Sequence, residues 1–352
     1  MQERVDVPAT TAGVIVAMPK VELHVHLEGC VTPEMALHFA RKNQWPYPHE
    51  SIKQAVAAME FSDLSSFISV ARVNSQTLRA VDDYCEVARQ YLRRMHDENV
   101  VHVEMAVSPQ GFKRRGLEIK PCIEALARAF QEALDNFGMT GGIIAGCQRD
   151  RPPDEAMEML NELRACGDSI LAVGLHGAEW QNEPRLFERH FQFARAHGWH
   201  TVAHAGEEGP ADYVAQALDI LAVERIDHGV RAEENPALLE RLAAEQIPLT
   251  VCPLSNVKLG VFARLEEHNV ARLLRAGVAV SLHSDDPPYF GGYLSRCFEK
   301  TAAALDLSPA EVVEMNKNAI RAAFLDRGTK QRLLAKSDAI LRRVSDNVDR
   351  HL

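Results

Sequence analysis

Short apolar runs alternate with longer amphipathic segments along most of this chain. The apolar runs have the length and the β-branched content of buried strands, whereas the longer segments repeat apolar residues every three or four positions, as helices do. The predicted strands are Val21–Val25, Val100–Val107, Gly141–Cys147, Leu171–Leu175, His200–His204, Arg225–His228, Ile247–Val251 and Val278–His283. The clearest predicted helices are Ile119–Asn136, Asp154–Cys166, Arg185–His197, Ala211–Leu221 and Pro236–Glu245.

Strands that alternate with helices indicate a parallel sheet built of βα units. Eight such strands in one undivided chain predict an α/β fold of the (β/α)8 TIM barrel type, which usually needs ~250 residues. The chain has 352 residues, and we place the surplus in a helical insertion over 33–98 and in C-terminal helices over 292–345. We therefore expect an N-terminal tail over 1–18 and a single domain over 19–352. An open, doubly wound sheet is the alternative, but no GxGxxG motif follows a predicted strand.

The charge balance narrows the classes of partner. Lys and Arg number 39 against 49 Asp and Glu, and this formal net charge of −10 disfavours both a nucleic-acid surface and a polybasic membrane anchor. No run of about 18 apolar residues predicts a membrane span. The seven cysteines include no CxxC pair, which favours reduced thiols over a disulfide framework. We expect a cytoplasmic protein that acts on a small molecule.

Side chains that bind metals or carry protons gather where the predicted strands end. The active face of a barrel is the rim formed by the carboxyl ends of its strands, so these side chains are expected to meet there. A single histidine in such a place is usually structural, but a set of them on several strands is hard to explain by packing alone. The set comprises His24, His26, Glu104, His176, His204, His228, His283 and Asp285.

The first strand offers the clearest half-site for a metal. His24 and His26 are two positions apart, so both imidazoles lie on one face of the strand. Two neutral imidazoles on one face suit zinc, although a lone HxH is more often a pair of surface histidines. His204 ends an apolar strand and offers a third nitrogen. Asp285 and its neighbour Asp286 follow the last strand, where separate partners, a metal and a substrate donor, would relieve their repulsion; a solvated turn is the alternative.

The remaining polar residues suit proton transfer. Glu207 follows His204 in a glycine-flanked loop, and it is a candidate proton carrier unless it serves only as negative charge near a helix start. His228 is a candidate acid or base, or a structural histidine. Three imidazoles, one carboxylate and a water in an open position make a catalytic zinc site, which predicts metal-assisted hydrolysis.

The ordered motifs MPKVELHVHLEG, HAGEEGP, RIDHGV, PLTVCPLSNVKLGVF and SDDPPYFGGY resemble the adenosine/adenine deaminase family of the amidohydrolase superfamily, from about Pro19 to Leu325. The resemblance implies a (β/α)8 barrel with one zinc ion per chain and hydrolytic deamination of a 6-aminopurine. The ligands that it implies are His24, His26, His204 and Asp285.

The same resemblance implies roles for the neighbouring residues. Glu207 would protonate purine N1, which makes C6 electrophilic, and His228 would position or deprotonate the water that zinc binds. Asp286 would form a hydrogen bond with purine N7, and the main chain near Gly177 would face N3. The His/Cys signature of deaminases that act on flipped-out bases is absent.

The branch of the family is indicated by Glu28. Nucleoside-using members typically carry Asp there, so the longer Glu is expected to fill space that a ribose needs, and the chain looks most like the adenine deaminase branch. Several positions that we expect near the pocket depart from that branch, which leaves adenosine, other adenine nucleosides (including aminodeoxyfutalosine) and N6-substituted adenines open. These positions are Ala71–Arg72, Met105–Pro109, Arg114–Gly116, His176 and His283.

Two other classes remain as alternatives. A two-metal hydrolase would carry a bridging lysine after the fourth strand, but no lysine lies between Lys120 and Lys258. A non-catalytic zinc-binding protein would not need Glu207 and His228 beside its ligands. The oligomeric state is open, and a homodimer is possible.

Overall fold

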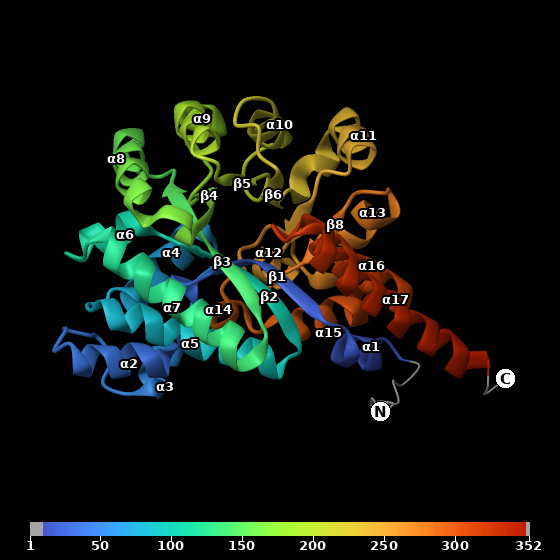
Figure 1. Ribbon diagram of the computed structural model, residues 1–352, viewed down its shortest axis with the longest axis horizontal. Coiled ribbons are helices and arrows are strands. Elements are labelled where there is room, and N and C mark those ends of the chain that lie inside the picture. Colours follow the sequence, from blue (N-terminus) through green and yellow to red (C-terminus); the bar gives the residue numbers. More distant parts are fainter. Residues whose placement is uncertain (1–9, 350–352) are drawn as a thin grey trace.

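The computed structural model describes residues 10–349, with the side chains of 344–349 left out, and contains one parallel sheet of eight strands in the order β1 to β8. The sheet curls around a central axis and helices cover its outside (Figure 1). The predicted (β/α)8 barrel and all eight predicted strands are therefore confirmed. The strands are β1 Lys20–His26, β2 Val100–Val107, β3 Thr140–Gln148, β4 Ile170–His176, β5 His200–Ala205, β6 Arg225–His228, β7 Leu249–Val251 and β8 Val280–Leu282.

Helices fill the connections between strands and both surplus segments. The predicted insertion over 33–98 contains α2 to α5, and the predicted C-terminal helices are α15 to α17. The helices are α1 Thr11–Ala17, α2 Pro33–Lys42, α3 Ile52–Ala57, α4 Leu64–Ser75, α5 Val81–Asp97, α6 Pro109–Arg114, α7 Ile119–Phe137, α8 Pro153–Leu163, α9 Glu188–Ala196, α10 Ala211–Asp219, α11 Pro236–Glu245, α12 Pro253–Lys258, α13 Val270–Arg275, α14 Pro287–Phe290, α15 Leu294–Leu305, α16 Pro309–Ala322 and α17 Arg327–Asp349. Within these described residues, no helix is both long and apolar enough to cross a membrane.

The N-terminal segment differs from the predicted tail. Thr10 caps α1 by accepting a hydrogen bond from the Gly13 N–H, and Val14, Ile15 and Met18 are buried against the barrel. Burial of three apolar side chains offsets the entropy lost on ordering this short helix. The tail prediction is therefore wrong for this helix, and residues 1–9 lie outside the described residues. The single domain over 19–352 stays a prediction.

The barrel closes through the residues that follow β8. Strands β1 and β8 share one isolated bridge, between Val25 and Asp285. The Asp285 N–H donates to the His24 carbonyl at 2.9 Å, and the His26 N–H donates to the Asp285 carbonyl at 3.1 Å. Closure therefore occurs at the carboxyl ends of the strands, where three of the predicted metal ligands lie.

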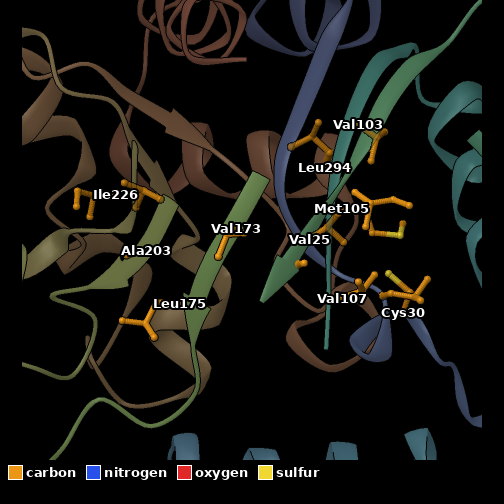
Figure 2. Packing of buried hydrophobic residues seen from close by; sticks show 14 of the residues in the cluster. Val25, Cys30, Val103, Met105, Val107, Val173, Leu175, Ala203, Ile226 and Leu294 are labelled. Atoms are coloured by element: carbon orange, nitrogen blue, oxygen red, sulfur yellow. The ribbon is translucent and has the colours of Figure 1, made fainter. Parts of the chain in front are cut away.

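Side chains along each strand alternate between an apolar layer outside the sheet and the inside of the barrel. Outward-facing apolar side chains pack under the helices, and Figure 2 shows part of this layer, with Val103, Met105 and Val107 on β2 and Val173 and Leu175 on β4. Because successive side chains point to opposite faces, the residues between them enter the barrel. The inward-facing residues of β1 and β2 include four polar side chains, His24, His26, His102 and Glu104.

Glu104 belongs to the barrel interior rather than to the active face where its sequence position suggested it. Its Oε2 accepts a hydrogen bond from Arg225 at 2.8 Å, and its Oε1 accepts one from the Phe324 N–H, which follows α16. Both charged side chains are fully buried. Burial alone would raise the pKa of Glu104, but Arg225 and His102 outweigh it and lower the pKa to about 2.

We expect Glu104→Gln to lower the free energy of unfolding by about 3–5 kcal/mol, because Arg225 would lose its buried counter-ion. The folded-state pKa lies below the unfolded value near 4.5, so this contribution is present above pH 4.5 and is lost as pH falls toward 2. Urea unfolding at several pH values measures both effects, with the exposed Glu240→Gln as a control. A loss no larger than that of the control would contradict the assigned role.

Candidate metal centre and active site

Three imidazole nitrogens and a carboxylate oxygen converge at the carboxyl end of the barrel. The Nε2 atoms of His24 and His26 lie 3.1 and 3.2 Å from the Nε2 atom of His204. Asp285 Oδ1 lies 3.4 Å from His26 Nε2 and 3.8 Å from His24 Nε2. Nitrogens that share one tetrahedral zinc, each at about 2.0–2.1 Å, are roughly 3.3 Å apart, and the spacings of His24 and His26 from His204 are close to this value.

The protonation of these imidazoles also fits a metal. His24 Nδ1 lies 3.0 Å from the Thr250 carbonyl, which can only accept a hydrogen bond, so Nδ1 carries the proton and Nε2 presents its lone pair to the centre. Burial lowers the pKa of His24 and lowers that of His26 to about 3. Neutral imidazoles whose lone pairs face one another repel unless a cation lies between them.

Asp227 supports this cluster and was missed as a functional residue in the sequence. Its Oδ2 lies 3.3 Å from His204 Nδ1, and its Oδ1 accepts a hydrogen bond from the Thr250 hydroxyl at 2.7 Å. A carboxylate at Nδ1 fixes ring orientation and leaves Nε2 free for a metal. Arg149 holds the same strand end, because its Nη1 donates to the His204 carbonyl at 2.7 Å. Asp227 lies in the quoted RIDHG motif, but only the inward face of β6 shows its role.

Glu207 and His228 lie beside the ligand cluster. His228 Nε2 is 3.5 Å from Glu207 Oε2 and 3.9 Å from Asp285 Oδ2, and both Glu207 and His228 are buried. Burial first, and then the charges of Asp285 and Glu179, raise the pKa of Glu207 well above its usual value. Glu207 Oε1 has no hydrogen-bond partner among the described residues. The arrangement places a buried carboxyl group with a raised pKa and an unpartnered oxygen beside the histidine cluster.

Two residues at the site have unusual backbone conformations. His228 has φ 65° and Asp285 has φ 62°, in the left-handed region that residues other than glycine rarely enter. At β6 this turn lets consecutive residues, Asp227 and His228, both face the cluster. Such backbone strain persists only where the surrounding structure maintains it, and it is common at functional sites.

Asp286, Glu28 and Gly177 face the same cavity. Burial and the neighbouring charge of Asp285 raise the pKa of Asp286. Gly29 is required beside Asp286, because a Cβ there would lie 1.4 Å from Asp286 Oδ1. Glu28 Oε1 accepts a hydrogen bond from the Ser108 N–H at 3.1 Å, which holds its side chain against the end of β2.

The departures that we expected near the pocket divide into two groups. His176 lines the cavity, and its Nε2 lies 3.2 Å from the Ser108 hydroxyl; Ala71, Arg72, Arg114 and Arg115 also line it. The expectation was wrong for His283, whose Nδ1 lies 2.9 Å from Glu22 Oε1 inside the barrel wall. It was also wrong for Met105, which packs outward in the apolar layer (Figure 2).

The cavity above the cluster has a volume of about 550 Å³. His26, His204 and Asp285 line its floor together with Glu207, His228 and Asp286, whereas His24 is nearly inaccessible beneath them. The opposite wall comes from α4 and includes Leu64, Phe67 and Ile68. A cluster that can bind a metal, a buried acid and a partly apolar wall in one cavity are typical of a metal-dependent hydrolase built on a (β/α)8 barrel.

The chain belongs to the adenosine deaminase family, which matches residues 19–340. It is 42% identical over 332 residues to an adenine deaminase of Cupriavidus necator, covering 94% of this chain and 95% of that protein. The crystal structure of an adenine deaminase from Arthrobacter aurescens superposes with a TM-score of 0.91 at 39% identity, covering 93% of this chain and 100% of that chain. The protein is thus a hydrolytic aminohydrolase.

A second solved relative concerns the metal. The structure of an amidohydrolase from Burkholderia ambifaria, which holds bound zinc, has a TM-score of 0.88 and 26% identity, covering 98% of this chain and 97% of that chain. In the present chain, His, Asp, Glu and Cys atoms form overlapping groups of three within 4.8 Å of one another, and every group contains His24, His26 or Asp285. The metal-dependent character typical of the family therefore agrees with the donor set.

Proposed function

We propose that this protein hydrolyses the 6-amino group of an adenine ring, so that adenine and water yield hypoxanthine and ammonia. The grouping of the Nε2 atoms of His24, His26 and His204 with Asp285, beside a buried Glu207 whose pKa is raised, carries this proposal. The adenine deaminases at about 40% identity over nearly the whole chain support adenine as the reacting base.

One zinc ion per chain fits the donor set, held by His24, His26, His204 and Asp285. When bound, zinc would make hydroxide available near neutral pH by acidifying a water molecule. All four donors are nitrogens or carboxylate oxygens, which zinc binds readily, and His24, His204 and Asp285 are buried.

The surrounding side chains then direct the reaction at C6. Glu207 donates its proton to N1, which withdraws electrons from C6 and stabilises the tetrahedral state more than the ground state. His228 positions the attacking water or takes its proton, Asp286 faces N7, and the main chain at Gly177 faces N3. One proton of the water reaches the 6-amino group, which departs as ammonia, and the other returns to Glu207 as the C6–O bond becomes a carbonyl.

Incubation of the zinc-loaded protein with adenine tests the proposal. We expect the adenine absorbance to be replaced by that of hypoxanthine, with one ammonia released for each base consumed. Full metal occupancy without release of ammonia from adenine or any 6-aminopurine would favour a non-catalytic zinc-binding protein instead. A cytoplasmic location, a homodimer and the lack of nucleic-acid or membrane partners stay predictions.

A further inference from the structure

Five arginines line the active-site cavity of a chain whose formal net charge is −10. They come from three separate parts of the barrel rim: α4 and the turn after it, the end of α6, and the loop after β3. The five are Arg72, Arg79, Arg114, Arg115 and Arg151. Neither metal binding nor attack at C6 uses any of them.

Arg114 and Arg115 already donate hydrogen bonds to Gln148 and Tyr84, whereas the guanidinium groups of the other three arginines keep hydrogen-bonding capacity in reserve. Arg72 makes no side-chain hydrogen bond or ion pair with the residues between 10 and 349. Arg151 Nε is buried without a hydrogen-bond partner among those residues, and its nearest carboxylate oxygen, on Asp150, is 3.9 Å away. Arg79 stacks on Trp45, 3.9 Å from the ring centroid, which fixes its position without neutralising its charge.

Arg114, Arg115 and Arg151 are close enough for their positive charges to repel one another. Burial, and then the positive charge of Arg151, lower the pKa of Arg114, and Arg115 adds to the effect. The carboxylate nearest to Arg114, on Glu155, lies 3.7 Å away and its side chain is 48% exposed, so its compensation is screened by water. Like charges held together at a cavity wall are relieved when an anion binds between them.

The most deeply buried carboxylates and the arginines lie at different depths of the cavity, and two further carboxylates in its lining, on Glu28 and Asp150, lie near the arginines. Glu207, Asp285 and Asp286 are at most 6% exposed and lie at the metal-binding floor. The arginines are half-buried or exposed and lie at the opening. In the proposed function C6, N1 and N7 of the purine face the floor, so the N3 and N9 side of the ring points toward the arginines.

The volume of the cavity also favours a substrate that is larger than the bare base. A cavity of about 550 Å³ falls within the ~300–1,000 Å³ that usually holds drug-sized ligands, and a bare bicyclic base fills only part of it.

We infer that the preferred substrate is a 6-aminopurine that carries a carboxylate or phosphate on the side of the ring opposite C6, bound by the arginines at the cavity opening. This inference rests on the proposed function for the orientation of the purine. Guanidinium groups bind both anions through paired N–H donors. The positive opening also draws anionic ligands into the cavity.

Matched pairs of ligands test the inference. For the zinc-loaded enzyme, kcat/KM is compared between 9-(2-carboxyethyl)adenine and 9-(2-carbamoylethyl)adenine, which differ in charge but hardly in size. Adenosine 5′-monophosphate and adenosine form the phosphate pair. Binding of each pair to Glu207→Gln is measured by calorimetry. We expect at least one anionic member to be preferred by about tenfold or more, as for a charge-assisted hydrogen bond, and the preference to shrink as ionic strength rises.

Variants assign the preference to residues. Arg151→Gln and Arg72→Gln should each reduce the anionic-to-neutral ratio several-fold, whereas Arg128→Gln, which removes an exposed charge on α7, should leave that ratio unchanged. Turnover of adenine with no preference in either pair would overturn this inference and leave the proposed function intact. Preferential binding of an anionic member without release of ammonia would support the inference and overturn the proposed function.

Discussion

Glu207→Gln is expected to lower kcat for adenine by at least about 10²–10⁴-fold while the protein keeps its metal. The amide has the shape of the acid but no proton that it can give to purine N1. Burial and the charge of Asp285 raise the pKa of Glu207, which favours the protonated form that this role needs. Steady-state release of ammonia and metal analysis of the same sample measure the two quantities.

The neighbouring Glu208 provides the control for this experiment. It is only partly buried and does not line the cavity above the metal cluster. Glu208→Gln should therefore retain most of the activity. If Glu207→Gln kept full turnover, or lost activity only in proportion to lost metal, the role of proton donor would be wrong.

Removal of the metal is expected to abolish turnover, and one equivalent of zinc per chain should restore it. His204→Ala removes the nitrogen on which the other two converge, and we expect neither tight metal binding nor activity from it. Asp227→Asn should weaken metal affinity by about 10–100-fold, because it removes the charge that orients the His204 ring. Metal competition and activity assays on the same preparations measure these effects.

His200 offers a matched control on the same strand. It lies at the start of β5, partly exposed, where it pairs with Glu224. His200→Ala should keep both metal and activity. Activity in metal-free protein, or restoration only by two equivalents of metal, would contradict a single-ion site.

The strands and the ligand positions follow from local patterns in the sequence. His24 and His26 share a face because the side chains of a strand repeat every two residues. His204 is placed at the end of its strand because the apolar run ends there. Nothing local predicts that β8 closes on β1 through Asp285 or that His283 turns into the wall toward Glu22. Both depend on pairing between residues about 260 positions apart in the chain.

Other parts of the site were missed for related reasons. Asp227 was passed over because strand alternation assigns it and His228 to opposite faces, and only the positive φ of His228 brings both to the cluster. Met105 looked like a pocket residue beside Ser108, but its parity on β2 places it in the outer layer. The arginine-lined opening was not predicted as a unit because its members come from segments that only the folded barrel brings together.

The closure of the barrel at Asp285 has a consequence for stability. The two hydrogen bonds that join β1 to the end of β8 use the backbones of His24, His26 and Asp285. An ion bound by these three side chains would also hold the first and last strands together. Part of its binding free energy would therefore stabilise the closed barrel. In the part of the chain that the structure describes, the other seven contacts between neighbouring strands are parallel ladders, whereas the backbones of β1 and the end of β8 are joined only by the isolated bridge at Asp285. Loss of the metal should therefore weaken the barrel first between β1 and β8.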